Sequence, residues 1–122
     1  MNNSNFGQKV PGAENTFAKT LNQGADMEVQ RVHVLEGGNI PLHSHSFGQS
    51  YVVVEGEGTI VTSSGKTQVG PGSAGYFNPE EAHSWQNESS NNLVFISSSA
   101  SEEGIYETNE GSGGKWNIHY HS

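Results

Sequence analysis

The hydrophobic and polar positions of this chain alternate over short runs, a pattern typical of β-strands rather than helices. The clearest runs are 27–35 and 49–55, and the second contains Tyr51-Val52-Val53-Val54. Valine and tyrosine favour strands, and glycine-rich turns follow both runs. Shorter runs predict further strands at 42–47, 59–62, 67–69, 75–77, 83–86 and 93–97. No segment has the pattern of a helix longer than two turns, so the sequence predicts an all-β sandwich or barrel.

The two ends of the chain lack this clear alternation. Residues 1–26 are polar and interrupted by turns such as Pro11-Gly12, which predicts a flexible N-terminal arm. Residues 27–97 hold the strong strand patterns and form the expected barrel core. Residues 98–122 begin with a Ser-, Glu- and Gly-rich stretch, so we expect a loop followed by a last strand or a frayed tail.

Composition supports a single β domain and excludes several classes of function. A chain of 122 residues with 16 Gly and 4 Pro has room for one domain and is poor in helix formers. Its formal net charge of -8 disfavours nucleic acids and anionic membranes, because its 5 Lys and Arg residues form no cluster. Cysteine is absent, and we find neither an apolar run of ~20 residues nor a leader-like N-terminus. We therefore expect a cytoplasmic protein that uses no thiol chemistry.

Histidine spacing predicts a metal site. His43 and His45 are two residues apart, so on a strand they point to the same face and present two imidazoles to one ion. Gln49 follows a turn at Gly48 and offers an amide oxygen from the next strand, and His83 adds a third imidazole from a distant strand. The alternative is that these side chains lie in turns and bind nothing. A second His-x-His, His119 to His121, lies in the C-terminal tail, where it could bind metal adventitiously or fold over the barrel mouth.

These residues lie in a glycine frame that resembles the two motifs of the cupin superfamily. The positions that match the first motif are Gly37, His43, His45, Gln49 and Gly56, and those that match the second are Gly72, His83 and Asn87. The sequence departs from the motifs at Gln49, where glutamate is usual, and at Asn78 and Glu80, where proline and glycine are usual. The resemblance covers roughly residues 27–97.

This resemblance implies a double-stranded β-helix, the RmlC-like jelly-roll barrel, with a metal ion in its mouth. The implied cofactor is one divalent ion per chain, held by His43, His45, Gln49 and His83; Zn, Fe, Ni, Mn and Cu all accept such ligands. The resemblance also implies a small-molecule substrate or ligand and a homodimer formed by strand exchange or sheet packing.

Gln49 changes the chemistry that this site can perform. Its amide is neutral and cannot act as a base, so a bound ion keeps its full charge and polarises a carbonyl, hydroxyl or water oxygen more strongly. A catalytic base must then come from elsewhere. Tyr51 shares strand parity with Gln49, although it could equally be a packing residue, and Arg31 and His33 share one face of the preceding strand. These three are the candidate catalytic residues.

Two classes of function remain open at this stage. The first is a metal-dependent enzyme acting on a small polar or carbonyl-bearing molecule, either a lyase, isomerase or cyclase or a dioxygenase. Small cupins that linearise unsaturated uronates look similar around the first motif, but residues 98–103 contain no arginine at the place where that group carries one. The second class is a binding or sensing module whose metal ion is structural. We expect an enzyme.

Overall fold

The protein is built from β-strands throughout the residues that the computed structural model describes, which are 6–100 and 118–121. Within them, no helix has the length and hydrophobicity needed to cross a membrane. The strands are β1 (Gln8–Lys9), β2 (Glu14–Gln23), β3 (Met27–Ser44), β4 (Gln49–Glu55), β5 (Gly58–Thr62), β6 (Gly65–Val69), β7 (Ala74–Phe77), β8 (His83–Gln86), β9 (Leu93–Ala100) and β10 (His119–Tyr120).

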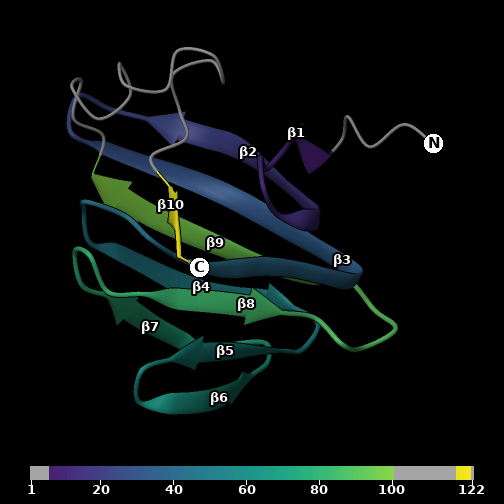
Figure 1. Cartoon of the computed structure of the whole chain (residues 1–122). Coiled ribbons are helices and arrows are strands. Elements are labelled where there is room, and N and C mark those ends of the chain that lie inside the picture. Colours follow the sequence, from purple (N-terminus) through teal and green to yellow (C-terminus); the bar gives the residue numbers. More distant parts are fainter. Residues whose placement is uncertain (1–5, 101–117, 122) are drawn as a thin grey trace.

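Strand β3 organises the fold because it belongs to both walls of a barrel. Its first half pairs with β2 and β9, whereas its second half pairs with β8 and β10. The main order is β6-β5-β8-β3-β9-β4-β7, and the sheet curls about β3 so that its two ends face each other (Figure 1). The predicted all-β jelly-roll barrel is confirmed. The strand predicted at 27–35 and the first half of the one predicted at 42–47 belong to one continuous strand of 18 residues, and residues 45–47 follow it outside any strand.

The N-terminal segment is not the flexible arm that its polar composition predicted. Residues 14–23 form β2, which pairs with β3 from Glu14 opposite Asn39 to Gln23 opposite Glu28. The inward positions of β2 include Thr16 and Ala18, both buried. Because these inward residues are small or carry a hydroxyl group, hydrophobic and polar residues alternate only weakly along β2. The sequence pattern therefore did not predict this strand. Pairing with β2 covers one edge of β3. Without β2, the backbone N–H and C=O groups along that edge would have no hydrogen-bond partners in the sheet.

The C-terminal expectation was also partly wrong. Residues 98–100 extend β9 rather than beginning a loop, and β10 pairs antiparallel with the end of β3, placing His119 opposite Ser44 and Tyr120 opposite His43. The Tyr120 hydroxyl donates to the Pro11 carbonyl at 2.6 Å, which fastens this strand to the turn before β2. The rest of the predicted loop, 101–114, lies outside the described residues.

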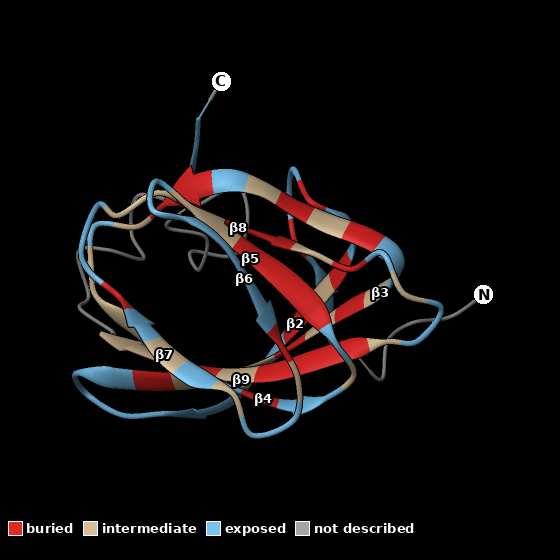
Figure 2. Cartoon of the chain, turned by 90° about the horizontal axis from the view of Figure 1, so that it is seen from below, coloured by how far each residue is buried: buried red, intermediate tan, exposed pale blue. Residues whose placement is uncertain are grey.

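The core fills the space between the walls of the barrel. Buried positions, red in Figure 2, are frequent in β5 and β9 and alternate with less buried ones along much of β3. Trp85 stacks on Phe95 with ring centroids 3.8 Å apart, which joins β8 to β9 across the interior. The turn after β4 depends on Gly56, whose φ of 80° lies in the left-handed region and whose hydrogen faces the Asn92 carbonyl at close range.

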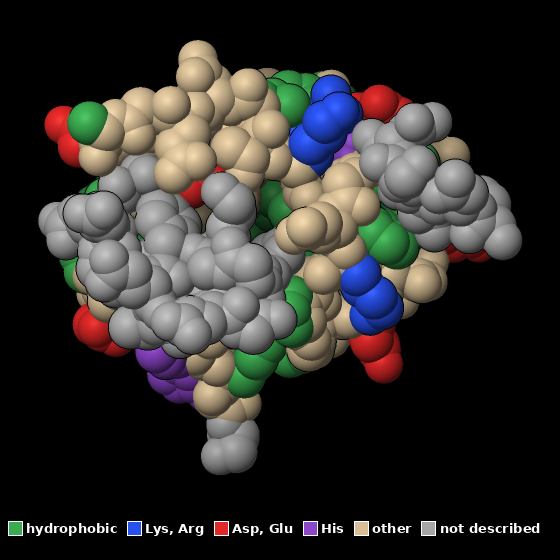
Figure 3. Space-filling view, turned by 90° about the horizontal axis from the view of Figure 1, so that it is seen from above, with side chains coloured by type: hydrophobic (Ala, Val, Ile, Leu, Met, Phe, Trp, Pro, Cys, Tyr) green, Lys and Arg blue, Asp and Glu red, His purple; other side chains and the backbone are tan. Residues whose placement is uncertain are grey.

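Charge on the surface is dispersed. Seen from above, the Lys and Arg side chains of the described residues form separate groups rather than a continuous basic patch (Figure 3). This distribution agrees with the acidic balance of the whole chain, 13 Asp and Glu against 5 Lys and Arg.

Candidate metal centre

Three histidines from two strands and one turn converge at one end of the barrel. His43 near the end of β3 and His83 at the start of β8 are direct cross-strand partners, and His45 follows just after β3. One ligand nitrogen from each ring lies within 4.8 Å of those of the other two. The ring centroids of His43 lie 4.2 Å from His83 and 5.0 Å from His45. The spacing of the three residues in the sequence therefore predicted a real cluster.

Backbone carbonyls orient two of the three rings. The Nδ1 of His43 lies 2.7 Å from the Pro41 carbonyl, and the Nδ1 of His83 lies 2.9 Å from the Glu81 carbonyl. A carbonyl oxygen only accepts, so each Nδ1 carries the proton and donates it, and each Nε2 keeps its lone pair. The Nε2 of His83 is buried without a partner among the described residues. Such an orphaned acceptor is what a metal ion would satisfy.

The surroundings keep the two inner rings uncharged. Burial is the main cause that lowers the pKa of His43 to about 3 and that of His83 to about 4, and the neighbouring histidines add to both shifts. Phe77 stacks on the His83 ring at a centroid distance of 3.7 Å, which contributes to that desolvation. Metal ions bind the neutral form of imidazole, so these rings are ready to bind near neutral pH.

The donor set fits a divalent transition metal. Three imidazole nitrogens are a common ligand set for Zn, Fe, Ni and Cu. Gln49 begins β4 and lines the same cavity as His43 and His45.

The cluster borders a cavity of about 70 Å³ inside the barrel. A space of this size admits a few water molecules or a small organic group. The wall combines apolar and polar side chains. The cavity is lined by Val10, Ala18, Glu28, Gln30, Val32, Ile40, His43, His45, Phe47, Gln49, Trp85, Phe95, Ser97, Ser99 and Ile118.

The structure does not bring the three candidate catalytic residues into this cavity lining. Tyr51 faces the interior, as its parity with Gln49 predicted, but its ring packs on Phe77 and Trp85 at centroid distances of 5.2 and 5.0 Å. Burial raises the pKa of Tyr51. This environment matches the packing alternative.

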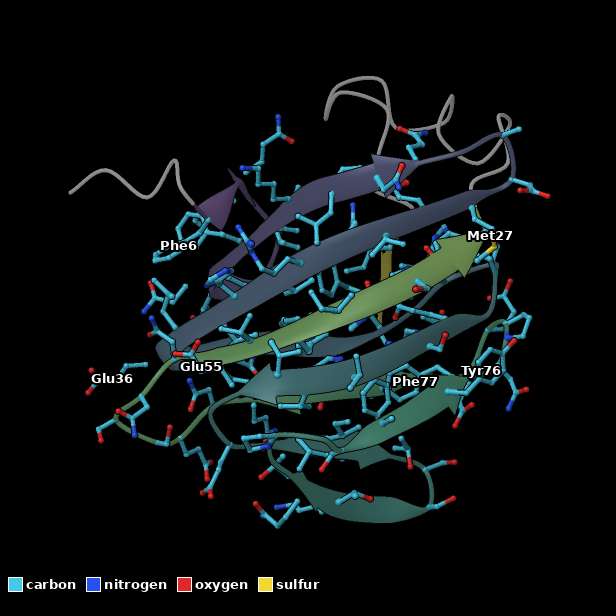
Figure 4. The ribbon with its side chains drawn as sticks, turned by 180° about the vertical axis from the view of Figure 1, so that it is seen from behind. Phe6, Met27, Glu36, Glu55, Tyr76 and Phe77 are labelled. Carbon is cyan, nitrogen blue, oxygen red and sulfur yellow. The ribbon has the colours of Figure 1, made fainter. Side chains whose placement is uncertain are left out.

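Arg31 and His33 point away from the cavity, because they alternate with Val32 and Val34, which are buried on the inner face of β3. His33 stacks on Phe6, whereas the metal-site ring of His83 stacks on Phe77. Phe6 and Phe77 are widely separated in Figure 4, so His33 is remote from the cluster. The sequence left open which face of this strand is inward, and the fold decides it.

Sequence reasoning missed a further polar group of the cavity lining. Glu28 and Gln30 share the parity of Val32, and they line the cavity with Ser97 and Ser99. That shared parity was the available signal. Sequence reasoning also left open the place of His121, whose Nε2 lies 3.0 Å from the hydroxyl of Ser44, the residue after His43.

The second motif contributes structure as well as a ligand. Asn87 is buried, and its side-chain amide donates to the carbonyls of Val34 at 2.9 Å and Asn91 at 2.7 Å, which holds the loop after β8 against β3. Glu80 occupies the position where the motif usually has glycine, and its φ of 66° is in the region that favours glycine. Its backbone amide donates to the His45 carbonyl at 2.7 Å, which joins the loops that carry His45 and His83.

Comparison with solved structures finds the same fold in several proteins. The polyketide cyclase RemF from Streptomyces resistomycificus superposes with a TM-score of 0.71 and 22% identity, over 76% of this chain and 70% of that one. A cupin-like protein from Thermotoga maritima gives a TM-score of 0.69 and 20% identity, over 81% and 80%. The DMSP lyase DddQ from Ruegeria pomeroyi gives 0.65 and 14%, over 71% and 47%. At these identities the likeness concerns the fold.

Comparison with curated protein sequences gives no match. The family model of the cupin domain, however, matches residues 30–99, more than half of the chain, and this range contains both histidine motifs. With the barrel and the two motifs in place, this match shows that the chain belongs to the cupin family.

Proposed function

We propose that this cupin is a metal-dependent enzyme that acts on a small polar or carbonyl-bearing organic molecule. The observation that carries the proposal is the cluster of His43, His45 and His83, with the buried Nε2 of His83 that has no partner among the described residues, beside a cavity lined by both polar and apolar side chains. We place the reaction among the lyase, isomerase and cyclase types or among the dioxygenases.

The metal would supply a Lewis acid that polarises a substrate oxygen, or a redox centre if it is iron or copper. The chain contributes the environment for that chemistry. His43, His45, His83 and Gln49 are uncharged donors, so they leave the charge of the ion uncompensated. The apolar side chains of Phe47, Trp85 and Phe95 exclude water from part of the cavity, which strengthens electrostatic interactions inside it.

The fold relatives support this reading at the level of reaction type. One of them is a polyketide cyclase and another is a DMSP lyase, so the same barrel hosts non-redox chemistry on organic substrates in those proteins.

A second candidate function is the binding or sensing of a small ligand by a barrel whose metal is structural. The placement of Tyr51, Arg31 and His33 favours it, since none of the three candidate catalytic residues lines the cavity.

The test is elemental analysis of untagged protein purified without added metal. About one equivalent of Fe or Cu per chain directs the search to oxygen consumption, whereas one equivalent of Zn, Ni or Mn directs it to lyase and isomerase assays on uronates and β-dicarbonyl compounds. Either result supports a metal enzyme once turnover is found. Protein that holds less than about a tenth of an equivalent, and takes up none on titration, would refute the metal centre.

A further inference from the structure

The C-terminal strand β10 lies beside the end of β3 that carries His43 (Figure 1). The second half of β3 pairs with β8 along one edge, and at His43 it pairs with Tyr120 of β10 along the other. The backbone amide of His121 donates to the Leu42 carbonyl at 2.8 Å. Residues 118–121, which we call the latch, therefore cover an edge of the strand that carries a proposed metal ligand.

The side chains of the latch reach the metal centre and the cavity. The Tyr120 ring makes an edge contact with the His43 ring, with centroids 5.8 Å apart and 61° between the ring planes. Ile118 lines the cavity and packs against the hydrophobic core. The Nε2 of His121 lies 3.0 Å from the hydroxyl of Ser44, the residue after His43. The latch thus forms part of the cavity wall and covers one side of a ligand ring.

The latch is held by far fewer contacts than the strands of the barrel. Strand β10 is two residues long and both residues are exposed, whereas β3 pairs with β9 over residues 27–34. Each hydrogen bond contributes only modestly to stability in water, so a segment held by a few of them opens more often than the whole barrel unfolds. The latch can therefore open while the barrel stays folded.

Tyr120 is the side chain that fastens the latch. Its hydroxyl donates to the Pro11 carbonyl at 2.6 Å, in the turn before β2. Its ring also lies against Gly12, where an added Cβ would collide with it. The same ring contacts His43. One side chain thus links the N-terminal turn, the latch and a proposed metal ligand.

We propose that Tyr120 is a positioning residue of the metal centre, and that opening of the latch controls the access of ions and small molecules to His43. With the latch closed, the cavity holds about 70 Å³, which is room for a small group, so a larger molecule enters when the latch opens. The inference rests on the proposed function for the metal ion alone. The cover over His43 belongs to the chain itself and is present in metal-free protein as well.

The first experiment measures how fast His43 reacts with diethyl pyrocarbonate in the metal-free whole chain. Peptide mass spectrometry gives the rate for each histidine, under conditions in which a chain reacts at most once. His33 is the internal reference, because both of its ring nitrogens are buried and it lies outside the latch. Its rate therefore reports opening of the barrel as a whole.

Tyr120→Phe keeps the ring on His43 but loses the hydrogen bond to Pro11. It should raise the His43 rate about fivefold, the effect of one hydrogen bond on the opening equilibrium. Tyr120→Ala loses the ring contacts as well and should raise the rate further. Val54→Ala, at an exposed position on β4, is the matched control and should keep the wild-type rate. His33 should react at the same rate in all four proteins.

Two results of this experiment contradict the proposal. Equal His43 rates in the wild type and both Tyr120 variants would overturn it. A parallel rise of the His33 and His43 rates would also overturn it, because Tyr120 would then stabilise the whole barrel rather than a local closure. If Tyr120→Ala does not fold, Tyr120→Phe decides alone.

A second experiment follows the release of Zn from loaded protein to an excess of chelator. Release should become faster in the order wild type, Tyr120→Phe, Tyr120→Ala, and identical release rates would overturn the control of metal exchange by the latch. If the wild type binds no Zn yet the His43 reaction rates follow this order, the proposed metal enzyme fails and the latch stands.

Discussion

At the scale of single residues, two of the proposed metal ligands are both buried and oriented by a hydrogen bond. His43 and His83 are buried, and each has one ring nitrogen engaged by a backbone carbonyl. Burial excludes water, and the hydrogen bond sets the tautomer, so the remaining nitrogen is presented as a metal donor.

His83→Ala is expected to abolish stoichiometric metal binding while the barrel still folds. The loss should exceed the ~10–100-fold that removal of a hydrogen-bond partner of a ligand causes, because a ligand itself is gone. Metal content and circular dichroism are the measurements. His33→Ala, whose ring stacks on Phe6, is the control and should keep its metal. Full metal content in a His43→Ala, His83→Ala double variant would contradict the ligand assignment.

Gln49→Glu should retain the metal but change its affinity and reactivity. The carboxylate adds a negative charge to the donor set, so divalent ions should bind more tightly and act as weaker Lewis acids. Competition with a chelator measures the affinity. An affinity identical to that of the wild type would show that residue 49 does not reach the ion.

At the scale of elements, the turns position the ligands. Gly56 lies in the turn that leads from β4 to β5, and a Cβ there would collide with the Asn92 carbonyl in addition to demanding a left-handed backbone. Both constraints act on the junction between the strand that begins with Gln49 and the segment that leads into β9.

Gly56→Ala is therefore expected to destabilise the protein by about 2 kcal/mol or more, from backbone strain plus displacement of the 91–93 segment. Denaturant unfolding measures it. Gly24→Ala is the matched control, since the nearest atom to an added Cβ there is the Met27 carbonyl oxygen at 3.8 Å. Equal stability of the two variants would argue against the close approach at Gly56.

At the scale of the whole molecule, buried neutral histidines link stability to pH. The pKa of His43 falls to about 3 and that of His83 to about 4 on folding, both below the ordinary value of 6.5. The unfolded chain therefore binds more protons than the folded one throughout the interval between these values.

Metal-free protein should consequently have the full contribution of these two rings above pH 6.5. It should lose that contribution progressively as the pH falls below 6.5, completely once the pH is below about 4 for His83 and about 3 for His43. Unfolding midpoints measured across this range should decline steadily. His83→Ala should show a shallower decline than the wild type, and an identical slope would show that His83 does not carry the linkage.

The homodimer expected from the family resemblance stays a prediction. The outer face of β4 exposes Val52 and Val54, at 37% and 48%, and these would contribute apolar area to such a contact. Sedimentation equilibrium of purified protein measures the mass, and a species of 13.1 kDa at micromolar concentration would contradict the prediction.

Local sequence determined the all-β class, most of the strand positions and the three histidines that meet. These depend on short-range rules, since side chains alternate along a strand and the glycine frame marks its turns. Tertiary structure alone decided which face is inward, because alternation distinguishes two faces without saying which one another strand will cover. That choice turned Arg31 and His33 outward, brought Glu28 into the cavity and made a strand of residues 14–23, whose stability comes from pairing with β3 rather than from its own composition.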